Sequence, residues 1–315
     1  MSKVPEAEVG KEGNWYVLVA NLPHLHEPFV LAPGISLRPL EFPLDVFDLA
    51  AVGSVGFREW AAIEPIIGRC TCEIESACDA GIQGGLNTLN RAWLALGLLV
   101  LRGFTDANGV ACSSYAWSAI PIPGAGNGWS RETRDVTKRR CRTDLPPFKG
   151  NLLDYHLGML KDDTIRNDPL NGDDAEWIRQ HFETFNGLAT ENEQFYFAFQ
   201  AAVDWRYCKD CRTAVARIWS GIEAIFGISS ELIYRLSLLT ASLLEPRGEE
   251  RKSRFYEVKK LYGLRSKVVH GEQLPNEKIV TALNESYHLL RDLLLLIIER
   301  GRMLSSDDFD DAVFN

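Results

Sequence analysis

The sequence has no long hydrophobic run. Its longest apolar segments, residues 92–101 and 293–298, are much shorter than the roughly 20 residues that a helix needs to cross a bilayer. Residues 1–13 are polar and acidic, and they lack the basic start and apolar stretch of a signal peptide. These absences predict a cytoplasmic protein without a membrane partner.

Cysteine is also scarce. Seven cysteines, an odd number, in 315 residues do not indicate the disulfide framework of a small secreted domain. Cys70, Cys72 and Cys78, together with Cys208 and Cys211 at a two-residue gap, could supply four thiolates to a zinc ion. Packing of small thiols in the interior explains them more simply. We therefore expect no metal and no other cofactor.

Positive charge is low overall but locally concentrated. The net charge of −9 argues against a general nucleic-acid coat, yet residues 247–267 hold eight Lys or Arg against three Glu, a net +5. Residues 131–149 hold seven more basic residues, with Trp129 and Phe148 at the edges of the cluster. Basic residues with aromatic neighbours can hold a single-stranded phosphate backbone and stack bases. The alternative for both clusters is a solvated face or loop.

The first half of the chain predicts a domain of mixed structure. Residues 15–20, 29–40 and 112–122 are rich in aromatic and β-branched side chains and are bounded or broken by Pro and Gly, which is typical of strands. Residues 86–101 have apolar side chains at helical spacing. A helix packed on a sheet follows from this pattern.

The second half predicts helices almost to its end. The segment 167–174, with Pro169 and Gly172, is the best boundary between the two halves. We therefore expect an α+β domain over residues 1–172, with a sensing or restraining role, an all-α helical bundle over 173–302 and a solvated acidic tail over 303–315. The expected helices cover residues 174–186, 191–207, 211–226, 230–244, 249–269 and 276–300.

The end of the helix over 249–269 carries the most informative pattern. Arg265 lies five residues before His270, and Gly271 follows, where it can form a left-handed helix cap. An imidazole moves protons near neutral pH, and a guanidinium clamps a phosphate through paired hydrogen bonds. Together the two groups can cleave RNA without a metal. The alternative is a structural Arg and a surface His.

Arg265 needs a partner because it falls on an apolar helix face. An unpaired buried charge is costly. Glu223 is the best candidate, since it lies between Trp219 and Phe226 on another apolar helix. We therefore predict an ion pair between Arg265 and Glu223. The predicted apolar stripe around Arg265 contains Phe255, Val258, Tyr262 and Val269.

Two sequence segments point to a known family. Residues 217–226 read Arg-Ile-Trp-Ser-Gly-Ile-Glu-Ala-Ile-Phe, and residues 264–271 read Leu-Arg-Ser-Lys-Val-Val-His-Gly. With the helix between them, they resemble an HEPN domain of the ApeA-like branch over residues 173–302. The resemblance implies a helical bundle in which Arg265 and His270, paired across a homodimer, form a metal-independent ribonuclease site. Many members act in bacterial anti-phage defence or as toxins.

Supporting residues are also expected. Glu223 would orient Arg265, and Ser266 stands where the family usually has Asn, Asp or His. This departure leaves a second hypothesis open, a non-catalytic HEPN module that binds RNA, a nucleotide or a partner protein. In either case a regulatory partner or antitoxin is compatible with the family. The basic cluster supplies four candidate RNA-binding residues, Arg254, Lys259, Lys260 and Lys267.

Overall fold

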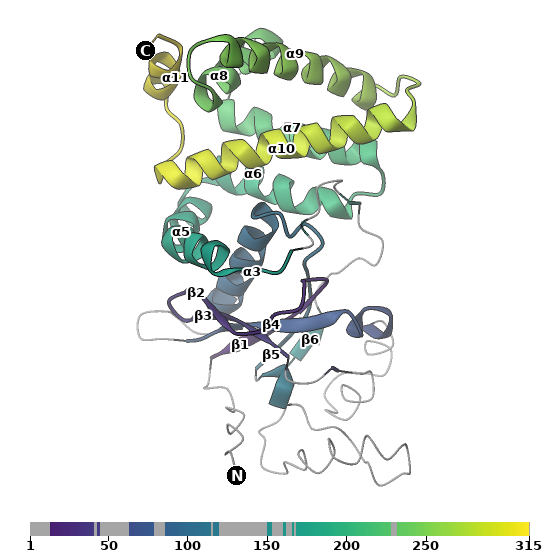
Figure 1. Ribbon diagram of the computed structural model, residues 1–315, viewed down its shortest axis with the longest axis vertical. Helices are drawn as coiled ribbons and strands as arrows, with labels where there is room; N and C mark the ends of the chain where they lie inside the picture. Colours follow the sequence, from purple (N-terminus) through teal and green to yellow (C-terminus); the bar gives the residue numbers. More distant parts are fainter. Residues whose placement is uncertain are drawn as a thin grey trace. The chain divides into compact units, whose positions relative to one another are not determined.

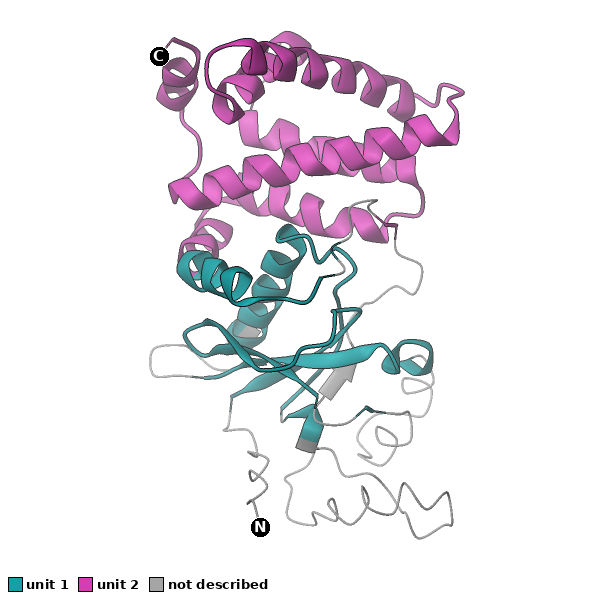
Figure 2. Ribbon diagram, viewed as in Figure 1, with its two compact units in different colours: residues 1–157, 166–182 teal, residues 158–165, 183–315 magenta. Residues whose placement is uncertain are grey.

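The chain forms two compact units (Figure 2). Unit 1 comprises residues 1–157 and 166–182, and unit 2 comprises residues 158–165 and 183–315. The dividing point therefore lies inside a helix, whereas the sequence placed it at residue 172. The computed structural model describes residues 13–40, 43–44, 63–78, 86–114, 116–119, 150–152, 160–161, 166, 168–227 and 232–314.

Within the described residues, unit 1 contains an antiparallel sheet of six strands in the order β2-β3-β4-β1-β5-β6. The helix α3 (Leu86–Leu101) covers the predicted residues and packs on β1 and β4 (Figure 1). An α+β N-terminal part is therefore confirmed. The strands are β1 (Trp15–Ala20), β2 (Phe29–Ala32), β3 (Ile35–Pro39), β4 (Cys70–Ser76), β5 (Asn108–Ser113) and β6 (Gly150–Leu152), and a short 3-10 helix, η1, covers Trp117–Ala119.

Two strand predictions need correction, and one strand was not predicted. The segment predicted over 29–40 is a hairpin of two strands, because Gly34 turns the chain with a φ of 72°. The strand predicted over 112–122 begins earlier, at Asn108, and ends at Ser113. The sequence also missed β4, which lies between β1 and β3 at the centre of the sheet. Its Glu73 and Glu75 broke the apolar pattern that marks a buried strand.

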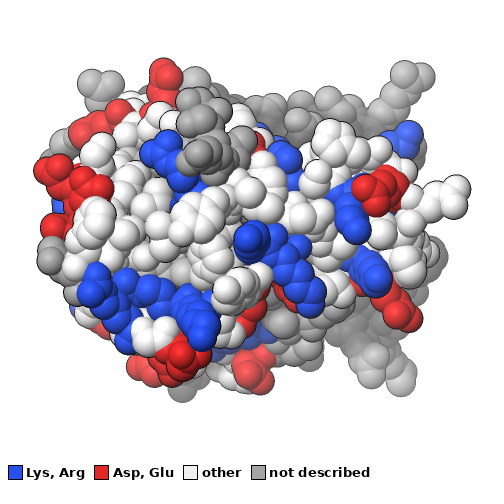
Figure 3. All heavy atoms as spheres, turned by 90° about the horizontal axis from the view of Figure 1, so that it is seen from above, with Lys and Arg blue, Asp and Glu red and all other residues white. Residues whose placement is uncertain are grey.

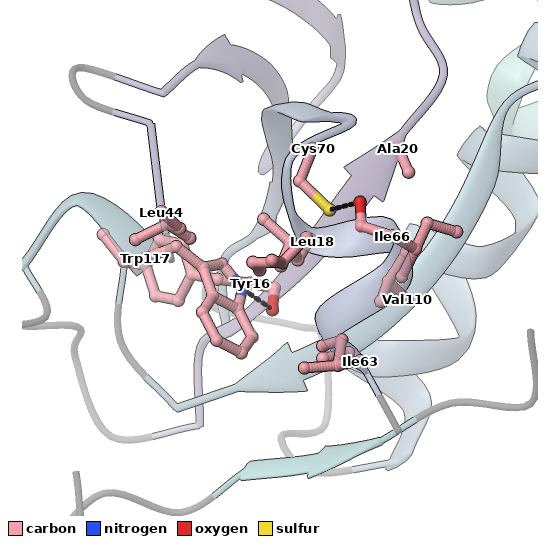
Figure 4. Packing of buried hydrophobic residues seen from close by; sticks show 12 residues of the cluster. Tyr16, Leu18, Ala20, Leu44, Ile63, Ile66, Cys70, Val110 and Trp117 are labelled. Atoms are coloured by element: carbon pink, nitrogen blue, oxygen red, sulfur yellow. Dashed lines mark hydrogen bonds between the residues drawn. The ribbon is translucent and has the colours of Figure 1, made fainter. Parts of the chain in front are cut away.

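A cluster of large buried side chains forms one part of the unit 1 core. Trp117 is fully buried, and its Nε1 donates a hydrogen bond to the carbonyl oxygen of Tyr16 at 3.1 Å (Figure 4). Cys70 lies in the same cluster, where its thiol donates to the carbonyl oxygen of Ile66 at 3.6 Å. The indole N–H is thus satisfied inside an apolar cluster, as a buried Trp requires.

The cysteines of unit 1 behave as core residues. Cys70 and Cys72 are buried in β4, and burial raises the pKa of the Cys70 thiol to about 12. In unit 2, Cys208 and Cys211 are partly exposed. Within the described ranges, no group of three or more His, Cys, Asp or Glu residues is placed to hold a metal ion.

Unit 2 is mostly helical, as predicted. The observed bounds of three helices, α7, α9 and α10, match the predicted ones. The helix predicted over 191–207 ends earlier, and a 3-10 turn follows it. None of the helices in the described segments is both long and apolar enough to span a bilayer. The helices are α5 (Gly172–Glu191, shared between the units), α6 (Glu193–Asp204), η3 (Trp205–Tyr207), α7 (Cys211–Phe226), α8 (Leu232–Leu244), α9 (Glu249–Val269), α10 (Asn276–Arg300) and α11 (Ser306–Phe314).

The helix α7 is central to unit 2, since it contacts α6, α9 and α10 (Figure 1). Gly221 makes this possible. A Cβ atom at position 221 would lie 2.8 Å from the Cβ of Ala201 and 3.3 Å from the Cα of Ala198. Only glycine allows α6 to approach so closely, which explains a glycine in the middle of a helix.

The C-terminal acidic segment, predicted as a solvated tail, forms the helix α11, and none of the residues of this helix is buried. Asp308 receives Arg302 Nη1 at 2.6 Å and the Ser305 backbone N–H at 2.8 Å, and these contacts hold the pKa of Asp308 below its usual range. Phe309 lies against Phe226, with ring centroids 5.7 Å apart. The acidic residues in the first turn also suit the positive end of the helix dipole, so the segment gains a structure that its charge did not indicate.

Candidate functional site

The predicted ion pair between Arg265 and Glu223 is confirmed. Arg265 Nη2 donates to Glu223 Oε1 at 3.0 Å, which joins α9 to α7. The pair is not fully buried, because the side chain of Arg265 is 20% exposed and that of Glu223 is 29% exposed. The guanidinium is thus held by one nitrogen and remains accessible. Its Nε is buried and has no hydrogen-bond partner within the described part of the chain.

Aromatic rings support Arg265 from the side of the core. Its guanidinium carbon lies 5.3 Å from the centroid of the Tyr262 ring, at cation–π distance. Tyr262 in turn meets Trp219 edge-on, with centroids 5.2 Å apart. Trp219 is buried and donates from Nε1 to Ser286 Oγ at 2.7 Å. Groups from α7, α9 and α10 therefore position one guanidinium.

The buried stripe of α9 differs from the predicted one. Val269 keeps 37% of its exposure, and Phe255 and Tyr262 are only half-buried. The observed and predicted stripes share Val258 and the position of Arg265, whose long side chain reaches from the stripe to Glu223. The prediction was wrong for Phe255, Tyr262 and Val269, because the buried line of the helix runs through residues 258, 261, 265 and 268. Its fully buried members are Val258, Leu261 and Val268.

His270 lies at the C-terminal end of α9. Its backbone N–H donates to the carbonyl oxygen of Ser266 at 3.0 Å, and the N–H of Glu272 donates to the carbonyl oxygen of Lys267 at 3.0 Å. Gly271 has a φ of 79°, so the predicted left-handed cap is confirmed. His270 itself is exposed, and its ring forms no hydrogen bond or ion pair with any residue that the structure describes. The imidazole is thus fixed at its backbone and open to solvent.

Arg212 binds the C-terminal end of α9, a contact that the sequence did not predict. It lies in the first turn of α7, where Asp210 caps the helix. Its Nη1 donates to the carbonyl oxygen of Val268 at 2.6 Å, and its Nη2 donates to that of Glu272 at 2.8 Å. These two carbonyls flank His270. A cation here also suits the negative end of the α9 dipole, so Arg212 fixes the backbone on both sides of His270.

The predicted RNA-binding residues and Ser266 lie on different sides of α9. Arg254 is paired with Asp292 at 3.3 Å and with Glu257 at 3.6 Å, so it is largely occupied. Ser266 is half-buried. The remaining predicted RNA-binding residues, Lys259, Lys260 and Lys267, are exposed.

The exposed lysines do not share a face with Arg265. Lys260 and Lys267 are seven residues apart and therefore lie along one line of the helix, whereas Lys267 follows Arg265 by two residues, about 200° around the axis. The structure therefore brings Arg265 together with Glu223 but not with these lysines. The second basic cluster, over 131–149, lies outside the described residues.

Comparison of the chain with known proteins found no match. No protein-family model, no curated protein and no solved structure matches the chain. The functional argument therefore depends on the residues of this chain and on their geometry.

Proposed function

We propose that this protein is a metal-independent RNA endonuclease of HEPN type. One observation supports the proposal most: a partly exposed guanidinium, oriented by a carboxylate, and an exposed imidazole lie at the C-terminal end of a single helix. Arg265 and His270 are the proposed catalytic residues, with Glu223 and Arg212 as positioning residues. Cleavage would occur in the cytoplasm, in anti-phage defence or a toxin system, and residues 1–172 would sense or restrain it.

The proposed reaction is a transphosphorylation. The 2′-oxygen of a ribose attacks the adjacent phosphorus, the bond from phosphorus to the 5′-oxygen breaks, and a 2′,3′-cyclic phosphate and a 5′-hydroxyl result. His270 takes the proton from the 2′-hydroxyl or delivers one to the leaving oxygen. Arg265 stabilises the negative charge that develops on the phosphorane.

Cleavage of mixed cellular RNA in the presence of EDTA tests the proposal. We expect full activity with the chelator, because Arg265 and His270 supply both the charge and the proton transfer. The cleaved ends should resist ligation that needs a 5′-phosphate and should carry cyclic phosphates by mass spectrometry. Activity that EDTA abolishes and magnesium restores would contradict the mechanism. Binding of RNA without any cleavage would favour the non-catalytic module.

Glu223→Gln is expected to lower the cleavage rate by about 10- to 100-fold, the usual cost of a lost supporting contact. The amide keeps the size of the side chain but not the charge that orients Arg265. Stability should change little, by about 1 kcal/mol or less, because the pair is partly exposed. Single-turnover rates and thermal melting measure the two effects.

Glu176→Gln provides the matched control. Glu176 forms an ion pair with Arg179 at 2.7 Å on α5, which is remote in sequence from the site. This substitution removes the same charge and should leave cleavage unchanged. Equal rates for Glu223→Gln and the wild-type protein would refute the orienting role.

A further inference from the structure

An exposed aromatic cluster lies on α8 and α9. Tyr234 and Tyr256 keep 54% and 58% of their exposure, although large aromatic side chains usually bury most of their surface. Phe255 lies between them, with its centroid 5.5 Å from that of Tyr234 and 5.2 Å from that of Tyr256, both edge-to-face. The three rings therefore support one another and present ring surface to solvent. We name Tyr234, Phe255 and Tyr256 the aromatic platform.

Positive charge adjoins the aromatic platform. Lys259 Nζ lies 5.8 Å from the Phe255 centroid. Lys260 and Lys267 continue the exposed face along about 16 Å of helix from Tyr256, at 1.5 Å per residue. Between them, Gly263 has open space where a side chain would stand. Figure 3 shows several groups of Lys and Arg side chains on this face of the molecule, with Asp and Glu side chains beside some of them.

Few carboxylates interrupt this stretch of α9. Glu257 is the one carboxylate in the sequence from 256 to 267. It is engaged by Arg254 at 3.6 Å and accepts a hydrogen bond from Ser253 Oγ at 3.0 Å. The face thus combines ring surface, ammonium groups that form no ion pair with a described residue, and an open glycine, and its carboxylate is already paired.

We propose that the aromatic platform and the adjoining lysines bind single-stranded RNA. Unpaired bases stack on Tyr256 and Tyr234, and the phosphates of the same strand lie along Lys259, Lys260 and Lys267. Stacking accepts any base, because every base has a π face, and lysines on the line of a helix suit an extended backbone. A duplex is a poor ligand because its bases are already stacked inside.

This surface is separate from the guanidinium of Arg265, which lies on another side of α9. The binding proposal rests on the proposed function, because it takes RNA as the ligand. It adds that the RNA is single-stranded and that residues other than Arg265 and His270 bind it. The platform binds substrate and takes no part in proton transfer. Its loss should therefore change affinity, while the loss of His270 should change the chemical step.

Fluorescence anisotropy with a labelled 12-nucleotide oligouridine tests the proposal. The full-length His270→Ala protein is the background, so that the probe stays intact. Adding Tyr256→Ala should raise the Kd about tenfold, the scale of one lost stacking contact. Tyr256→Phe should keep the wild-type Kd because it keeps the ring. An RNA duplex of equal length should bind more weakly than the single strand.

The contribution of the lysines is tested separately, through the salt dependence of the Kd. Lys259→Ala and Lys260→Ala should each lower the slope of log Kd against log salt by about one, because each removes a phosphate contact. Tyr256→Ala should leave that slope unchanged. Tyr196→Ala is the control, since Tyr196 is an exposed ring on α6, with 38% exposure, outside the platform. It should not alter binding.

Equal Kd values for Tyr256→Ala and its parent would overturn the proposal. So would a protein that binds no oligonucleotide and instead self-associates through Tyr256. These experiments distinguish failure of the binding proposal from failure of the nuclease proposal. Binding through Tyr256 without cleavage by the wild-type protein would refute the nuclease alone. Cleavage by the wild-type protein, with Kd and KM unaffected by Tyr256→Ala, would refute the platform alone.

Discussion

Replacement of His270 by alanine is expected to reduce RNA cleavage by about 10²- to 10⁴-fold, the contribution of a positioned acid or base. The fold should be unaffected. The ring is exposed and forms no hydrogen bond with the described residues, and the backbone bond from residue 270 to Ser266 does not involve the side chain. Single-turnover cleavage and thermal melting of the same preparation measure the two quantities.

His26→Ala is the matched control, because His26 is an exposed imidazole in unit 1. It should retain full cleavage. A His270→Ala protein that cuts RNA at the wild-type rate would remove the imidazole from the mechanism. Arg265 would then lack the proton-transfer partner that this reaction requires.

Arg265→Ala should lower the cleavage rate by about 10²- to 10³-fold, the cost of removing one group that stabilises transition-state charge. Arg265→Lys should recover only part of this loss, because an ammonium keeps the charge but not the planar pair of donors. Stability should fall only slightly, since Glu223 is partly exposed and water can solvate it once unpaired. Rates for the two variants, measured with melting curves, separate charge from geometry.

A mixture of the two inactive variants tests whether the site is composite. One imidazole cannot easily be both the base for the 2′-hydroxyl and the acid for the leaving oxygen, so two-fold symmetry would supply a second His270. Mixing Arg265→Ala with His270→Ala should not restore full activity, because each mixed dimer lacks one Arg and one His. Both variants should still dimerise. Wild-type protein that cuts at full rate while sedimenting as a monomer at micromolar concentration would contradict the composite site.

The helices of unit 2 could be predicted because their limits are local. Asp210 caps α7, with its carboxylate accepting from the N–H groups of Arg212 and Thr213 at 2.9 Å. Gly227 and Gly301 end α7 and α10 with positive φ angles, and Pro275 precedes α10. Such signals involve residues within one or two turns of each other. They need no knowledge of the rest of the chain.

The pairing of Arg265 with Glu223 was also predictable, for an energetic reason. Both side chains stand among apolar residues, and charges in such positions are costly without partners. The sequence therefore indicated that the two would meet, although 42 residues separate them. It overestimated their burial, because a long side chain can leave an apolar stripe and reach the surface.

The sequence by itself thus determined the bounds of α7, α9 and α10, the cap at Gly271 and the ion pair of the site. Tertiary structure alone decided that β4 joins the centre of the sheet, that Arg212 holds the end of α9, and that the lysines and Arg265 occupy different faces. Strand pairing, capping of one helix by another and the rotation of a helix depend on contacts between distant segments. Patterns within one segment constrain such contacts only weakly.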